Sequence, residues 1–129
     1  MPRPASEQPT EVELQILNVL WDHGPSTVRE IHTQLSQHKD TNYSTTVKML
    51  SVMLDKDLVR RDESVRPQIF RAAVTRNTAQ KKMLKGLIHK VYEGSAKSLV
   101  LQALSTQKAS KQDLAEIRQL LDELEGETP

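Results

Sequence analysis

The sequence predicts a mostly α-helical protein with a small β-hairpin, arranged as a winged helix-turn-helix domain followed by a C-terminal helical region. Helically spaced apolar residues cover most of the chain, and capping residues precede these segments. A helix near 45–56 also runs directly into a hairpin pattern, with strands expected at 58–62 and 68–73. A second helix of a helix-turn-helix that is followed by paired strands is typical of the winged form.

The N-terminal elements follow from capping signals. Residues 1–9 contain three prolines and are expected to form a flexible arm. Thr10 and Glu13 match a capping box, which predicts a first helix to about Asp22 that ends at Gly24-Pro25. The core side chains of this helix are expected to be Leu14, Leu17, Leu20 and Trp21.

Two further helices complete the helix-turn-helix. Thr27 and Glu30 repeat the capping box and predict a second helix to about Gln37, with Val28, Ile31 and Leu35 inward. Ser44 is expected to cap the third helix. A helical wheel at about 100° per residue places Val47, Leu50 and Leu54 on the core side of that helix. It places Thr45, Lys48, Met49 and Val52 on the outer side. Phe70 is expected to join this core from the second strand.

The chain after the hairpin predicts three small helices. One starts after Thr75 and ends near Tyr92, one covers 98–104, and one is capped by Ser110. They are too small to bury a core of their own, so we expect a homodimer built from residues 75–129, beside a DNA-binding domain at 10–74. The residues expected to form the dimer are Leu84, Leu87, Ile88, Val91, Leu99, Val100, Leu104, Leu114, Ile117, Leu121 and Leu124.

Composition limits the possible functions. The chain has no cysteine, no close carboxylate pair and no phosphate-binding glycine loop, and its four histidines are scattered, so we expect no enzyme, metal or cofactor. It has no apolar run of 18 residues and no signal peptide, which predicts a cytoplasmic protein without membrane insertion. Residues 1–90 hold 14 Lys/Arg against 10 Asp/Glu, whereas residues 91–129 hold 4 against 7. A basic body suits a polyanion partner, although a solvated surface of uneven charge explains the counts equally well.

The third helix and the hairpin contain the candidate DNA contacts. Outward Thr45 and Lys48 can reach base edges or phosphates, and Met49 and Val52 can pack on thymine methyl groups. The candidate DNA-binding residues are Tyr43, Ser44, Thr45, Thr46, Lys48, Met49, Val52, Lys56 and Arg66. A packing role for Tyr43 and a capping role for Thr46 remain open. Arg60, Arg61 and Arg71 fit a solvated strand face better than a DNA contact.

Two functions are compatible with these residues. The first is a sequence-specific, dimeric transcriptional repressor that binds a double-stranded DNA operator. The second is a winged-helix module that docks on another protein through Met49 and Val52. The outward Lys48 and the basic hairpin favour DNA.

Four short segments, in order, are similar to the penicillinase repressor family. They are Glu13–Trp21 (ELQILNVLW), Thr27–Ile31 (TVREI), Tyr43–Leu50 (YSTTVKML), and Tyr92–Ser95 (YEGS) followed by Ser98–Leu101 (SLVL). The similarity covers roughly residues 10–125. It implies a dimeric winged-helix repressor on a palindromic operator, and possible partners in antibiotic or cell-wall stress signalling, namely a membrane sensor-protease system.

The chain departs from the family pattern at three places. The copper-responsive branch uses C-terminal cysteines, which are absent here, so copper sensing is not expected. The family's cleavage position, commonly Asn-Phe, falls at Gln102-Ala103, which does not favour induction by proteolysis. Asp57 stands where the family usually has glycine after the third helix, which we expect to lower stability without changing the fold.

Overall fold

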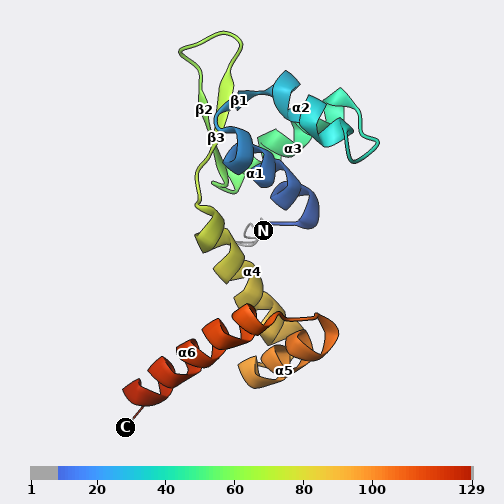
Figure 1. The fold of residues 1–129 in the computed structure, drawn as a ribbon. Helices are drawn as coiled ribbons and strands as arrows, with labels where there is room; N and C mark the ends of the chain where they lie inside the picture. Colours follow the sequence, from blue (N-terminus) through green and yellow to red (C-terminus); the bar gives the residue numbers. More distant parts are fainter. Residues whose placement is uncertain (1–8, 129) are drawn as a thin grey trace. The chain divides into compact units, whose positions relative to one another are not determined.

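The computed structural model describes residues 9–128, so the predicted arm lies outside the described chain except for Pro9. The described residues form two compact units, one up to Gly86 and one from Leu87. The predicted class is confirmed, because the chain is mostly helical with a small antiparallel sheet (Figure 1). The elements are α1 (Glu11–His23), β1 (Ser26–Thr27), α2 (Val28–Ser36), α3 (Tyr43–Asp55), β2 (Val59–Asp62), β3 (Ile69–Ala72), α4 (Arg76–Val91), α5 (Ala96–Thr106) and α6 (Lys111–Glu127).

Capping side chains fix where α1 and α2 begin. Thr10 accepts a hydrogen bond from the backbone N–H of Glu13, and the Glu13 carboxylate accepts one from the backbone N–H of Thr10. Thr27 and Glu30 form the same reciprocal pair at α2. Both predicted capping boxes are therefore confirmed. The helix α1 ends at Gly24, whose φ of 80° lies in the region that glycine adopts most easily.

The start of α3 corrects one prediction. Asn42, and not Ser44, is the N-cap, because its side-chain oxygen accepts the backbone N–H of Thr45 at 2.8 Å. Ser44 lies inside the first turn of the helix and its hydroxyl donates to Asn42 as well. Asparagine is among the preferred N-cap residues, so the sequence did contain this signal.

The sheet has one more strand than the predicted hairpin. Strands β2 and β3 pair antiparallel with Arg61 opposite Phe70, which confirms the hairpin. The two-residue strand β1 adds to the free edge of β3 and gives the order β1-β3-β2. Ser26 and Thr27 are polar and show no alternation, so no local pattern indicated this strand.

The core of the first unit lies between its three helices and the sheet. Phe70 closes it from β3, as predicted, and Leu17, Leu20, Ile31, Leu35 and Leu50 are also buried as predicted. Further buried side chains that the sequence analysis did not select are Ile16, Met53, Leu58 and Val59.

Five predicted core positions need correction. Val47 is 44% exposed, and Leu14, Trp21, Val28 and Leu54 are only partly buried. Thr46, Leu50 and Met53 form the buried side of α3 instead, spaced by four and three residues. The true core side is thus rotated relative to the predicted one.

The second unit contains the end of α4, and α5 and α6, close to their predicted positions. Ser95 and Ser110 cap α5 and α6, and Ser110 forms a third capping box with Asp113. Neither α5 nor α6 has a buried residue. Within residues 9–128, no helix combines the length and apolar character needed to cross a bilayer.

Candidate nucleic-acid interface

The outer face of α3 is the main candidate surface for DNA. Ser44, Lys48, Ser51 and Asp55 are exposed and recur at intervals of three or four residues, which places them along one side of the helix. Thr45 and Val52 flank this row on one side and Val47 on the other. Hydroxyl groups, one ammonium group and apolar side chains are therefore available together on the face that would enter a groove, with the carboxylate of Asp55 at its C-terminal end.

Two of the predicted DNA contacts, Met49 and Thr46, do not lie on this exposed face. Met49 is only partly exposed and packs against the core cluster. Thr46 is 1% exposed, and its hydroxyl lies 2.9 Å from Nδ1 of His32 in α2. A buried hydroxyl needs a partner, and His32 supplies one. Thr46 therefore holds α3 against α2 and presents nothing to solvent.

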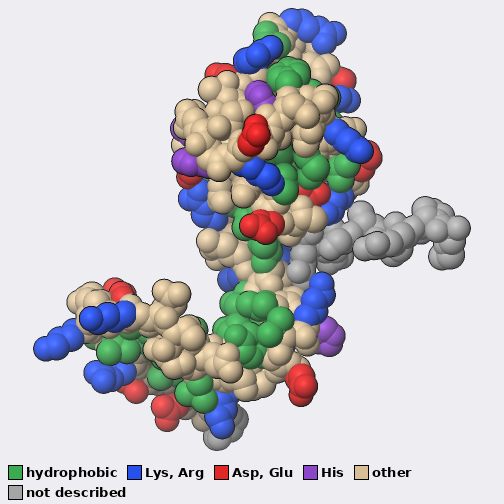
Figure 2. All heavy atoms as spheres, turned by 90° about the vertical axis from the view of Figure 1, so that its right-hand side faces the viewer, with side chains coloured by type: hydrophobic (Ala, Val, Ile, Leu, Met, Phe, Trp, Pro, Cys, Tyr) green, Lys and Arg blue, Asp and Glu red, His purple; other side chains and the backbone are tan. Residues whose placement is uncertain are grey.

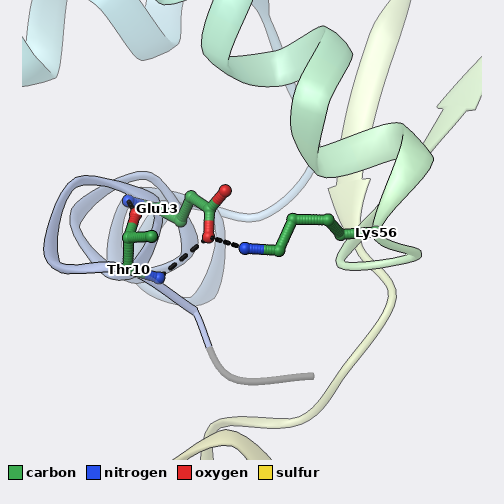
Figure 3. A network of polar contacts seen from close by, with 3 residues as sticks. All are labelled: Thr10, Glu13 and Lys56. Atoms are coloured by element: carbon green, nitrogen blue, oxygen red, sulfur yellow. Dashed lines mark hydrogen bonds and ion pairs between the residues drawn. The ribbon is translucent and has the colours of Figure 1, made fainter. Parts of the chain in front are cut away.

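Lys56 also has a different environment from the one predicted. Its ammonium lies 2.7 Å from Oε1 of Glu13, and the two side chains are only 10% and 2% exposed (Figure 3). The same carboxylate oxygen accepts the backbone N–H of Thr10 at 2.8 Å. We therefore remove Lys56 from the candidate DNA-binding residues, because its ammonium group forms an ion pair within the domain.

Tyr43, the first residue of α3, is 39% exposed and has neighbours on α2. The guanidinium carbon of Arg29 lies 4.8 Å from the centre of its ring, and the His32 ring meets it nearly edge-on at 5.6 Å. The packing role that the sequence left open is thus present, together with an exposed part of the ring. Arg29 was not among the predicted site residues.

Asn42 organises the hydroxyls at the start of α3. Its Oδ1 accepts three hydrogen bonds, each of 2.8 Å, from the Ser44 hydroxyl, the Thr45 hydroxyl and the Thr45 backbone N–H. A backbone N–H can only donate, which identifies the accepting atom as oxygen. Both hydroxyls therefore point their hydrogens at Asn42 and present lone pairs outward.

The loop between β2 and β3 is basic at its tip. Arg66 is exposed there, and Arg61 pairs with Glu63 at 3.0 Å. The Ser64 hydroxyl and backbone N–H both donate to Asp62, and these bonds hold the pKa of that carboxyl below its ordinary value. Lys and Arg side chains gather at this end of the first unit in Figure 2. The loop thus has a shaped turn and an exposed cation.

The residues predicted for dimerisation are largely accessible in the single chain. Hydrophobic side chains are visible on the surface of the C-terminal helices in Figure 2. The predicted residues with at least two fifths of their area exposed are Leu84, Leu87, Val91, Val100, Leu104, Leu121 and Leu124. The others, Ile88, Leu99, Leu114 and Ile117, are partly buried. Leu101 and Leu120 are exposed hydrophobic residues that the prediction omitted.

Residues 9–128 contain no group of three or more His, Cys, Asp or Glu side chains placed to hold a metal ion. The chemistry that the described surface offers is hydrogen bonding, cationic contact and apolar packing.

Comparison with known proteins identifies the family. The model of the penicillinase repressor family matches residues 9–123. A penicillinase repressor of Staphylococcus aureus is 20% identical over 112 residues, which cover 87% of this chain and 89% of that protein. The methicillin resistance regulatory protein MecI of S. aureus strain N315 is 22% identical over 113 residues, covering 88% and 92%. A penicillinase repressor of Bacillus licheniformis is 22% identical over 116 residues, covering 90% and 91%. The similarity inferred from four short segments is confirmed, and this chain belongs to the penicillinase repressor family, a family of DNA-binding transcriptional repressors.

Proposed function

We propose that this protein represses transcription by binding a palindromic DNA operator as a homodimer. The observation that supports this best is the outer face of α3, the second helix of the helix-turn-helix, where Ser44, Thr45 and Lys48 are exposed near the N-terminal end. The N-terminal residues of such a helix are the ones that reach base edges in the major groove.

The composition of α3 predicts modest direct readout. The helix contains no Arg, Asn or Gln, the residues that make two-pronged contacts with guanine or adenine. Val52 and Val47 can pack on thymine methyl groups, and the Thr45 oxygen can accept from a base amino group. We therefore expect sites that contain A·T pairs and are recognised in part through DNA shape.

The C-terminal helices support the dimer. Exposed leucines lie along α5 and α6, together with Val100 of α5, and neither helix has a buried residue in the single chain. Surfaces of this kind usually mark an interaction site. A second copy would cover them and would supply the two-fold symmetry that a palindromic operator requires.

The test combines DNA binding with a mass measurement. Gel shifts of the full chain against DNA upstream of its own gene are run across a salt series, with an unrelated duplex as control. We expect a preference for the upstream DNA and an affinity that falls steeply with salt, because phosphate contacts release counterions. Sedimentation should give twice the chain mass. A monomer, or equal affinity for both duplexes, would refute the proposal.

A winged-helix module that docks on a protein is the second candidate. It is favoured by Val47 and Val52, which are 44% and 38% exposed on α3. Met49 no longer supports it, because that side chain packs on the core. An apolar interface responds weakly to salt, so the same salt series separates the two functions.

We further propose that the repressor acts in the cytoplasm and is linked to antibiotic or cell-wall stress through a membrane sensor-protease system. The relatives named for penicillinase and methicillin resistance support this link. Gln102 and Ala103, at the family's cleavage position, are exposed on α5. They replace the family's Asn-Phe, so we do not expect cleavage there. In cells treated with a β-lactam, immunoblots should keep the full-length band while the repressed gene is induced, and no induction would refute the link.

A further inference from the structure

A cation stacked on an aromatic ring lies where α2 meets the start of α3. Arg29 is exposed in the first turn of α2, and its guanidinium carbon lies 4.8 Å from the centre of the Tyr43 ring. This contact extends the candidate surface from α3 to α2. In helix-turn-helix proteins the first of the two helices crosses the DNA backbone.

The ring beneath Arg29 is held from inside the domain. His32 meets Tyr43 at an interplanar angle of 77° and a distance of 5.6 Å. Nδ1 of His32 lies 2.9 Å from the hydroxyl of buried Thr46, and Nε2 lies 3.2 Å from the hydroxyl of Ser36. Both ring nitrogens of His32 thus have partners, and His32 in turn limits the positions available to Tyr43.

The hydrogen-bonding groups of Arg29 are available beside the ring. A guanidinium group has five N–H donors, and within residues 9–128 those of Arg29 donate to none of the side-chain acceptors that form the hydrogen bonds of this region. Among residues 9–128, the ion pairs do not include Arg29. The neighbouring Glu30 carboxylate accepts the backbone N–H of Thr27 at 2.8 Å, and this bond lowers its pKa. The described surface therefore carries a planar cation, arranged in advance, without a carboxylate partner.

We propose that Arg29 binds a phosphate of the DNA backbone and that Tyr43 acts as its positioning residue. The planar fork of Arg29 matches two phosphate oxygens, and the stack lowers the conformational entropy lost on binding. A phosphate contact carries no base information, so Arg29 adds affinity and register while α3 supplies the sequence preference. This proposal rests on the DNA-binding function proposed above.

The first test is Arg29→Gln in the full-length protein. Affinity for the operator and affinity for an unrelated duplex should fall by the same factor. We expect this factor to be about tenfold, the usual effect of losing one hydrogen bond to a charged group. The slope of log affinity against log salt should fall by about one unit. Arg118→Gln removes the same charge from an exposed position of α6 and should change the affinity much less.

The second test asks whether Arg29 acts through the ring. Tyr43→Phe keeps the stack, so Arg29→Gln should cost as much in that background as in the wild type. Tyr43→Leu removes the stack, and Arg29→Gln should then cost clearly less. A fold change in affinity that is equal in all three backgrounds would overturn the positioning role of Tyr43.

The outcomes distinguish this proposal from the one it rests on. If the wild type binds its operator and Arg29→Gln binds equally well with an unchanged salt slope, the phosphate site is refuted and the repressor function stands. If Arg29→Gln weakens operator binding alone, Arg29 reads bases and the proposal is also wrong. If the wild type does not bind DNA, both proposals fail.

Discussion

A single carboxylate oxygen of Glu13 joins the beginning of α1 to the end of α3. Oε1 of Glu13 lies 2.7 Å from the ammonium of Lys56, 43 positions further along the chain, and 2.8 Å from the backbone nitrogen of Thr10 (Figure 3). Glu13 is 1% exposed, so this pair is nearly removed from water. The helix proposed to read DNA is thus tied to the helix that starts the domain.

Removing one member of this pair should destabilise the first unit strongly. Glu13→Gln leaves the ammonium of Lys56 in an apolar region without its counter-ion, and such changes cost about 3–5 kcal/mol. Lys56 is 10% exposed and can turn partly to solvent, so we expect a value near the lower end. Urea unfolding followed by circular dichroism measures the change.

Two further variants show whether the charge pair itself is responsible. The double variant Glu13→Gln, Lys56→Met removes both charges and should recover most of the lost stability. Arg61→Met breaks the exposed pair with Glu63 and should cost at most about 1 kcal/mol. A double variant no more stable than Glu13→Gln alone would mean that packing or capping, and not the ion pair, sets the cost.

Asp57→Gly should stabilise the protein. Asp57 follows α3 with a φ of 59°, in the left-handed region that glycine adopts without steric cost. The predicted departure from the family's glycine thus coincides with a backbone conformation that favours glycine. We expect a gain of roughly 0.5–1 kcal/mol in urea unfolding, since aspartate tolerates this region better than most residues.

The matched control lies two positions earlier. Asp55 is the last residue of α3 and has no positive φ, so Asp55→Gly should lower stability through the added freedom of the unfolded chain. Opposite signs for the same chemical change would confirm that φ decides the effect. A loss of stability in Asp57→Gly would contradict the prediction.

Features of the fold that depend on local signals could be predicted from the sequence, whereas features that depend on long-range contacts could not. Capping boxes lie within four consecutive residues, so the starts of α1 and α2 could be read from the sequence. The core side of α3 could not, because both Val47 and Met53 are apolar and only the surrounding elements select Met53. Thr46 is polar, and its burial depends on His32, a residue 14 positions away.

The candidate site shows the same division. Thr45 and Lys48 are exposed as the helical wheel indicated. Lys56 was predicted to contact DNA, but it pairs with Glu13. The sequence gives no indication of this pair, because its two residues are 43 positions apart. Arg29 was not selected, since its stacking on Tyr43 depends on how α2 and α3 pack.

Replacing Thr45 and Lys48 together by alanine should abolish specific DNA binding while the fold remains intact. Both side chains are exposed, so no core contact is lost. Each lost base contact should cost about 1–3 kcal/mol of binding free energy. Fluorescence anisotropy with operator DNA measures the affinity, with Lys111→Ala in α6 as a charge control. Unchanged operator affinity in the double variant would mean that α3 does not read the sequence.

Arg66→Ala should weaken binding to all DNA sequences about equally. A cation at the tip of the loop between β2 and β3 can reach a phosphate but is poorly placed for base edges. The salt slope should fall by roughly one unit. Titrations against two operator variants decide the outcome, and a loss confined to one of them would indicate that Arg66 reads a base.

The position at which the C-terminal helices can be removed follows from contacts after β3. The Trp21 indole N–H donates to the backbone oxygen of Val74 at 3.0 Å. Arg76 pairs with Asp22 at 2.5 Å and lies over the Trp21 ring. A chain cut after residue 73 would lose these contacts, so the cut belongs after Gly86, where the first compact unit ends.

A chain that ends at Gly86 should be a folded monomer with greatly reduced operator affinity. Its core remains complete, because every buried hydrophobic residue of the described chain precedes Gly86. The exposed leucines of α5 and α6, which we propose to form the dimer, are removed. Binding of a second half-site is then no longer intramolecular, and this loss can weaken binding by about 10²–10⁴-fold. Sedimentation and circular dichroism of both chains measure mass and folding. A full-length chain that is monomeric at micromolar concentration would contradict the proposed dimer, because the C-terminal helices would then not bind a second copy.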